Sequence, residues 1–210
     1  MYIITLARPF GAGGHTLGER LAKRLSFSLV EEEMVNAIAE KAKVSPEWVK
    51  SVEAERGGFL MNFINSLVSP SFFERLTDDS KGYLDENIYV DILGSVMQEI
   101  ARESNAVIVG RGGQYFLREH PDAVHVLLTA DEKHRVQFLA QKYQITEDKA
   151  RQVVERGDKR RDNFYRKLKS KDFDDPSLYH LVLNMSRVTL DEAEDAICSL
   201  IQGRMAKKGR

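Results

Sequence analysis

The sequence predicts an α/β fold, a three-layer arrangement in which a mostly parallel sheet carries helices on both faces. Three observations lead to this prediction. Short apolar, β-branched runs alternate with helical patterns along most of the 210 residues, the first run leads directly into a glycine-rich loop and a helix, and the later runs are too apolar for exposed strands. This alternation is typical of parallel sheets, whose strands are buried on both faces.

The first elements have the clearest patterns. Residues 2–7 form an apolar run that ends at Arg8-Pro9, which predicts a buried strand. Residues 16–25 place apolar side chains on one helical face and charged side chains on the other, which predicts an amphipathic helix. A further helix is expected over 32–41, and Ser45-Pro46-Glu47 has the composition of a helix N-terminus.

The later elements follow the same logic. We expect a helix over 86–103, strands over 106–110 and 123–128, and a helix that begins after a cap at Asp131 and ends near Tyr143. A strand over 180–184 and a helix over 190–202 complete the series. Thr189 and Glu192 have the spacing of a capping box for that last helix. The basic tail, 204–210, is expected to be disordered.

Composition limits the classes of partner. Lys and Arg number 31 against 32 Asp and Glu, so the net charge of −1 gives no reason to expect a nucleic-acid partner or a membrane surface. No apolar run approaches the roughly 20 residues that span a bilayer. The single cysteine, Cys198, fits a reducing cytoplasm and is expected to be a packed thiol in the last helix. The five histidines show no metal-ligand spacing.

The segment Arg8-Pro-Phe-Gly-Ala-Gly-Gly-His-Thr16 joins the first strand to the first helix. Glycines allow successive backbone N–H groups to surround an anion, and the helix N-terminus adds its positive dipole end. The full GxxxxGK[ST] pattern is not met, because its lysine falls on Gly14 and its Ser/Thr on His15. The segment therefore predicts a phosphate-binding loop with Thr16 near a phosphate oxygen or a metal ion. The alternative is a tight turn that binds nothing.

Three segments carry a family resemblance. They are the loop Arg8-x-x-Gly-Ala-Gly-Gly14, the strand end Val107-Ile-Val-Gly-Arg111, and a stretch that runs from Asp158-Lys-Arg-Arg161 through Asp175-Pro176 to Asn184-x-Ser-Arg187. Together they resemble the cytidylate kinase-like family over nearly the whole chain. The departures are His15, where the family often has arginine, Glu31, where it usually has aspartate, and Gly112, where true cytidylate kinases have aspartate.

The resemblance implies a nucleoside-monophosphate-kinase fold in a single domain, residues 1–210. The core would comprise 1–41, 84–144 and 178–203, with a helical acceptor-binding insertion over about 42–83, a lid over about 145–177 and the basic tail 204–210 after the core. Within the predicted lid, residues 156–171 hold eight basic and two acidic side chains. Such a segment could close on a nucleotide, although a solvated helix face would have the same composition.

The site residues expected from these arguments fall into four groups. The phosphate loop would bind the donor through Arg8, Gly11, Ala12, Gly13, Gly14, His15 and Thr16. The catalytic cations would be Arg111, Arg160 and Arg161, and Lys159 and Arg166 would be further lid cations. Glu31 and Arg135 would contact substrate. No residue is assigned directly as a metal ligand.

Alternatives remain for several of these residues. Arg111 ends an apolar strand at the carboxyl edge of the sheet, where α/β folds place ligands, but a structural ion pair would also explain it. Arg135 could pack on a helix surface, and Glu31 could only favour a helix N-terminus. Asn184 and Ser186 could contact adenine or cap a turn.

The predicted function is transfer of a phosphoryl group from ATP, with Mg²⁺, to a small acceptor such as CMP or dCMP. Two alternatives are a nucleotide-binding regulatory protein with lost or slow kinase activity and a kinase for a different acceptor. Nucleic-acid binding through the basic segment is the weakest reading. The chain is expected in the cytoplasm, with a nucleotide and a small molecule as partners, no membrane, and a homo-oligomer left open.

Overall fold

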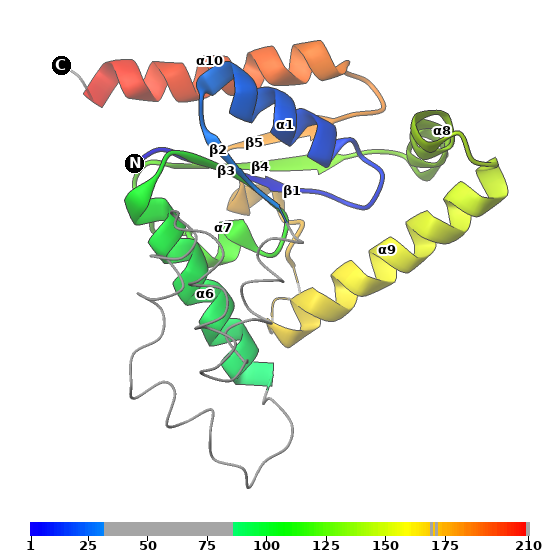
Figure 1. Ribbon diagram of the computed structural model, residues 1–210, viewed down its shortest axis with the longest axis horizontal. Coiled ribbons are helices and arrows are strands. Elements are labelled where there is room, and N and C mark those ends of the chain that lie inside the picture. The colour runs from blue at the N-terminus through cyan, green and yellow to red at the C-terminus, as the bar shows by residue number, and fades with distance from the viewer. Residues whose placement is uncertain (32–85, 169, 171, 209–210) are drawn as a thin grey trace, which may run out of the picture. The chain divides into compact units, whose positions relative to one another are not determined.

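The computed structural model describes residues 1–31, 86–168, 170 and 172–208. Five strands form one sheet in the order β2-β3-β1-β4-β5, and every neighbouring pair is parallel (Figure 1). The strands are β1 (Ile3–Ala7), β2 (Ser28–Val30), β3 (Ala106–Val109), β4 (Ala123–Thr129) and β5 (Leu181–Asn184). The α/β prediction is confirmed.

The described helices connect these strands. They are α1 (Gly14–Leu25), α6 (Glu86–Glu103), α7 (Gly113–Phe116), α8 (Glu132–Tyr143), α9 (Glu147–Lys167), a 3-10 turn (Pro176–Leu178) and α10 (Leu190–Lys208). The chain divides into two compact units, 1–31 with 100–210, and 32–99. The helix expected over 32–41 and the insertion expected over 42–83 lie outside the described residues.

Both faces of the sheet carry helices. α1 and α10 pack against each other on one face, and α7 contacts β1 from the other (Figure 1). Apolar side chains of β1, β3 and β4 form the main core with those of α1 and α10, as the sequence pattern predicted. A second cluster joins α8 to α9 through Val136, Leu139, Ala150 and Val154, and the side chain of Phe10 packs against it. The segment after β1 therefore lies between the main core and the α8–α9 cluster.

The start of α10 confirms the predicted capping box. The Thr189 amide donates to the Glu192 carboxylate at 2.8 Å, and the Glu192 amide donates to the Thr189 hydroxyl at 3.2 Å. These two bonds satisfy amide groups that the helix leaves without acceptors. Asp131 stands at the N-cap of α8 as expected, but its side chain makes no capping hydrogen bond.

The disorder expected over 204–210 is wrong for 204–208, because α10 continues to Lys208. The Arg204 guanidinium donates to the carbonyl of Ala123 at 2.9 Å, and Met205 packs against the main core. Basic residues in the last turns also interact favourably with the negative end of the helix dipole. The tail is therefore anchored to the start of β4.

Cys198 lies in α10, where the sequence predicts a packed thiol. Cys198 is buried, and burial raises the pKa of its thiol, so it is a packed thiol as expected. Within the described residues, no helix is both long and apolar enough to cross a membrane.

A buried histidine gives the fold a pH dependence. His125 on β4 is 4% exposed, its Nδ1 lies 2.9 Å from the Thr5 hydroxyl, and burial, followed by the charge of His180, lowers its pKa to about 4. An unfolded histidine has a pKa near 6.5. Between these values the unfolded chain binds a proton that the folded chain does not, so stability must fall as the pH falls.

We therefore expect the free energy of unfolding to drop by about 3 kcal/mol between pH 7 and pH 4 through His125 alone. Urea unfolding at a series of pH values measures this. His125→Asn keeps a polar group for Thr5 and should flatten the curve. Equal slopes for the wild-type chain and His125→Asn would contradict the assignment.

Candidate functional site

The loop after β1 has the geometry of an anion site. Gly11 and Gly13 adopt φ of +83° and +79°, a backbone region that side chains disfavour, and Gly13 is the N-cap of α1. The first hydrogen bond of α1 runs from the Leu17 amide to the Gly13 carbonyl at 2.9 Å. The amides that precede Leu17 in the first turn therefore have no intrahelical acceptor. No capping side chain and no acidic residue occupies that turn. An anion fits the electrostatics of this helix start.

Arg8 lies where the loop meets the end of β3. A Cβ atom on Gly14 would stand 2.8 Å from its Cγ, and one on Gly110 would stand 2.4 Å from a guanidinium nitrogen. The Arg8 side chain thus passes between two glycines that leave it room. Gly14, which stands where the GxxxxGK[ST] pattern has its lysine, leaves space that the Arg8 side chain fills.

Arg111 follows β3 in an unusual backbone conformation. Its φ is +49°, which costs roughly 1 kcal/mol in a residue other than glycine. Its guanidinium carbon lies 5.3 Å from the centre of the Phe164 ring on α9. With Arg8 beside Gly110, two predicted cations lie at the same carboxyl end of β3.

Arg135 is 8% exposed and lies beneath the phosphate loop. It donates to the Phe10 carbonyl at 3.0 Å and to Asp158 Oδ2 at 2.7 Å, and Asp158 Oδ1 accepts from the Phe10 amide at 3.1 Å. These three bonds hold both backbone polar groups of one loop residue. In the described structure Arg135 supports the loop, which agrees with the packing alternative.

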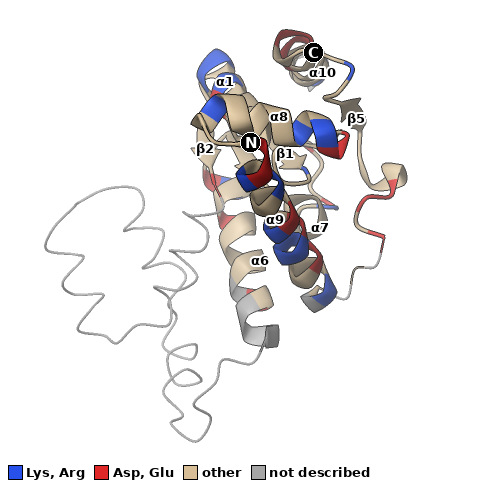
Figure 2. Ribbon diagram, turned by 90° about the vertical axis from the view of Figure 1, so that its right-hand side faces the viewer, with Lys and Arg blue, Asp and Glu red and all other residues tan. Residues whose placement is uncertain are grey.

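The predicted lid contains one continuous helix, α9, which contacts the loop at Gly157 and Asp158. The Phe10 ring lies so close to Gly157 that a Cβ there would stand 2.4 Å from it. Together with the Asp158 bonds, this contact fixes α9 to the loop. Basic and acidic side chains are interspersed along α9 (Figure 2). Lys159, Arg160 and Arg166 are exposed on it.

Arg161 differs from its neighbours because it is largely buried. It forms a bidentate pair with the Asp174 carboxylate, one bond of which measures 2.8 Å. Its guanidinium carbon lies 4.6 Å from the centre of the Phe173 ring, which stacks on Tyr165 at 4.1 Å. Burial works to lower the pKa of Arg161, but the bonds and charge of Asp174 leave it raised. Arg161 thus ties α9 to the segment before β5.

Polar side chains surround the start of α1. His15 Nδ1 lies 3.1 Å from the Glu31 carboxylate, and its Nε2 lies 3.5 Å from Glu19. Lys142, near the end of α8, donates to the Thr16 hydroxyl at 2.7 Å. An ammonium group at a helix N-terminus opposes the dipole, and an anion between the two would remove that opposition.

Lys142 was not singled out from the sequence, and Asp158 was given no role there beyond opening a segment that carries the family resemblance. Lys142 follows Arg135 by seven residues, about two helical turns, so the two share a face of α8. That spacing is the available signal for Lys142. Asp158 adjoins Gly157 inside α9, and a glycine within a helix often marks a close approach.

Asn184 and Ser186 cap turns in the described structure. The Asn184 side-chain oxygen accepts from the Ser186 amide at 3.0 Å, and the Ser186 hydroxyl accepts from the Asp131 amide at 2.7 Å. These bonds fit the capping alternative for both residues.

The residues present suit a nucleotide phosphate better than a dedicated metal cage. Among the described residues no group of three His, Cys, Asp or Glu side chains is placed to hold a metal ion. Mg²⁺ in kinase sites commonly keeps several waters and is held largely by substrate phosphates, so this arrangement is compatible with it. The Thr16 hydroxyl and the Glu31 carboxylate are oxygen ligands available around the first turn of α1.

Comparison with known proteins finds one matching family model and several similar structures. The cytidylate kinase-like family model matches residues 3–187. No curated protein matches the sequence. An uncharacterised protein from Eubacterium ventriosum has a similar structure, with a TM-score of 0.67 and 21% identity over 96% of this chain and 98% of that one.

Two named kinases have the same fold at lower similarity. Shikimate kinase from Bacteroides thetaiotaomicron gives a TM-score of 0.50 at 15% identity, over 96% of this chain and 98% of that one. A gluconokinase from Sinorhizobium meliloti gives 0.50 at 13% identity, over 98% and 97%. At these identities the likeness concerns the fold.

Proposed function

Because the chain belongs to the cytidylate kinase-like family, we propose that it transfers the γ-phosphoryl group of ATP to a nucleoside monophosphate, CMP or dCMP. The observation that carries the proposal is the loop over 8–16, where first-turn amides without intrahelical acceptors meet Arg8 and Lys142. Phosphoryl transfer needs positioning and cations more than covalent chemistry from the protein. The family and the kinase fold suit this reaction.

The proposed roles follow from position. The amides of Gly13, Gly14, His15 and Thr16 bind the donor phosphates. Arg111 and Arg160 stabilise charge on the group in flight, and Lys159 and Arg166 add positive potential. Arg161 is catalytic only if its Asp174 pair opens. Glu31 orients either His15 or the acceptor.

Transfer of the phosphoryl group to a nucleoside monophosphate needs no catalytic base. A phosphate oxygen of the acceptor forms a bond to the γ-phosphorus, and the bond from that phosphorus to the β-bridging oxygen breaks, which releases ADP. The acceptor oxygen is already ionised at neutral pH, so no proton has to be removed. Mg²⁺ bound with ATP would neutralise developing charge on the phosphates.

A coupled assay with ATP and CMP, dCMP or UMP tests the proposal. We expect turnover with one of them within the usual enzyme range, about 1 s⁻¹ or above. ATP binding without product from any nucleotide would favour the regulatory alternative, for which the glycine in the lysine position and the Arg161–Asp174 pair are the supporting observations. Product formed only from a non-nucleotide alcohol would redirect the acceptor assignment.

Lys142 should supply part of the charge that a loop lysine would provide. Lys142→Met removes the ammonium beside Thr16, and we expect the Kd for ATP to rise about tenfold, the value of one charged hydrogen bond. Isothermal titration measures it. Lys133→Met, on the exposed face of the same helix, is the matched control. Equal affinities for the two variants would remove Lys142 from the site.

A further inference from the structure

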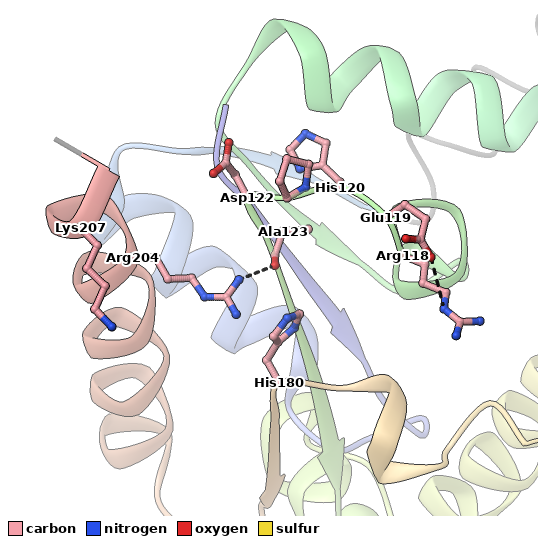
Figure 3. A pocket seen from close by; sticks show the side chains of 9 residues that line it. Arg118, Glu119, His120, Asp122, Ala123, His180, Arg204 and Lys207 are labelled. Atoms are coloured by element: carbon pink, nitrogen blue, oxygen red, sulfur yellow. Dashed lines mark hydrogen bonds and ion pairs between the residues drawn. The ribbon is translucent and has the colours of Figure 1, made fainter. Parts of the chain in front are cut away.

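A cavity of about 590 Å³ lies at the end of the sheet where β4 and β5 begin (Figure 3). The phosphate loop follows β1 at the other end of the parallel strands. Its walls come from the segment before β4, the start of β5 and the last turns of α10. The charged and titratable side chains that line it are Arg118, Glu119, His120, Asp122, His180, Arg204 and Lys207.

His180 presents a hydrogen-bond donor to this cavity. Its Nδ1 accepts the backbone amide of His125 at 2.9 Å, so the neutral ring carries its proton on Nε2. Within the described part of the chain, Nε2 has no hydrogen-bond partner. His180 can therefore donate to a ligand without first being protonated.

Arg204 and Lys207 bring positive charge from α10. Arg204 uses one nitrogen to bind the Ala123 carbonyl at 2.9 Å, and that bond turns its guanidinium toward the cavity beside His180 (Figure 3). Lys207 lies one turn further along and is exposed. The bond to Ala123 holds the Arg204 cation in place before any ligand arrives.

The basic side chains in the wall outnumber the acidic ones, with Arg118, Arg204 and Lys207 against Glu119 and Asp122. Glu119 lies 3.7 Å from Arg118, and both are strongly exposed, so each is largely compensated by the other and by water. Burial and then the charge of Arg204 lower the pKa of His180, and the charges of His180 and Arg204 act in the same direction on His125 behind it. The field at the cavity is positive.

The wall also contains a polar atom without a partner. His120 Nδ1 is buried and makes no hydrogen bond among the described residues. Buried polar atoms are nearly always satisfied by protein, water or ligand. The imidazoles of His120 and His180, the Arg204 guanidinium and the Lys207 ammonium group all belong to residues that line this cavity.

We infer that this cavity is a second anion site, which binds a small multivalent phosphate through His180 Nε2, Arg204 and Lys207. A phosphate group accepts several hydrogen bonds, and a guanidinium matches it in geometry. A metal ion does not fit, because no three ligating side chains converge among the described residues. The site is independent of the kinase proposal, since it shares no residue with the loop.

Histidine NMR of the full-length chain tests the inference, because the ring signals separate the two sites. His15 reports on the loop, and His120 and His180 report on the cavity. At pH 7 and constant ionic strength, we expect pyrophosphate to shift the His120 and His180 signals along one saturating curve with a Kd of about 1 mM or below. The His15 signal follows its own curve or stays still, according to the loop's affinity.

Variants decide whether the shift arises from the cavity. Arg204→Met should weaken the His180 curve about tenfold and Lys207→Met about threefold, while Lys23→Met on α1 should leave it unchanged. Lys207 is exposed, so its variant remains informative if loss of the Arg204–Ala123 bond impairs folding. A His180 shift that fails to saturate, or that is the same in the Lys207 and Lys23 variants, would overturn the site.

Discussion

Asp158→Ala should lower the free energy of unfolding by about 2–3 kcal/mol and weaken ATP binding at the same time. The carboxylate is the acidic partner of Arg135, which is 8% exposed, and removing one member of a buried pair leaves the other charge uncompensated. Asp158 is itself 34% exposed, which places the expected loss below that of a fully buried pair.

The second effect arises in the loop. Without Asp158 the Phe10 amide loses its acceptor, so the loop samples conformations that cannot bind phosphate. Asp162→Ala, one turn further along α9 and exposed, is the matched control. Urea unfolding and ATP titration measure the two quantities. If Asp158→Ala loses stability but keeps wild-type ATP affinity, the bonds of Asp158 to Arg135 and to the Phe10 amide serve folding alone.

Arg160→Met should reduce kcat about 10²–10³-fold while stability changes by no more than about 0.5 kcal/mol. Arg160 is exposed on α9, so its loss leaves packing intact, and its proposed role is confined to the transition state. Such a role lowers kcat with little effect on KM. Steady-state kinetics and thermal unfolding give both readouts.

Arg156→Met provides the comparison, because Arg156 is an exposed arginine one turn earlier on the same helix. We expect its kcat to stay near that of the wild-type chain. Similar losses in the two variants would mean that the general charge of α9, not one guanidinium, supports the reaction. Arg161→Met is a poor substitute test, since it would also break the bonds to Asp174.

The sequence predicted the parts of the fold that local patterns determine. The strand over 2–7, the first helix and the Thr189–Glu192 box are each specified by residues a few positions apart, and the structure has them. β2 is three residues long and α7 four, too short for a periodic pattern to be recognised. The end of α10 was missed because a contact with β4, 81 residues away in sequence, holds it.

The candidate site was predictable in its loop and less so around it. The glycines between Arg8 and Thr16 indicated a turn that needs positive φ angles, and two of these glycines adopt them. The partners of that turn come from distant segments. Arg135 reaches Phe10 across 125 residues and Lys142 reaches Thr16 across 126, and the sequence does not state which of many cations makes such a contact. Arg160 and Arg161 are adjacent in the sequence, yet Arg161 pairs with Asp174 and Arg160 is exposed. Only tertiary packing distinguishes them.

The passage of Arg8 beside Gly14 has an evolutionary consequence. A side chain at position 14 would stand 2.8 Å from the Arg8 Cγ, so Gly14→Lys cannot simply restore a lysine to the loop. The arginine would have to be replaced first, and that intermediate would have neither cation. The two positions are therefore coupled, and Gly14→Lys is expected to be tolerated only where a smaller side chain replaces Arg8.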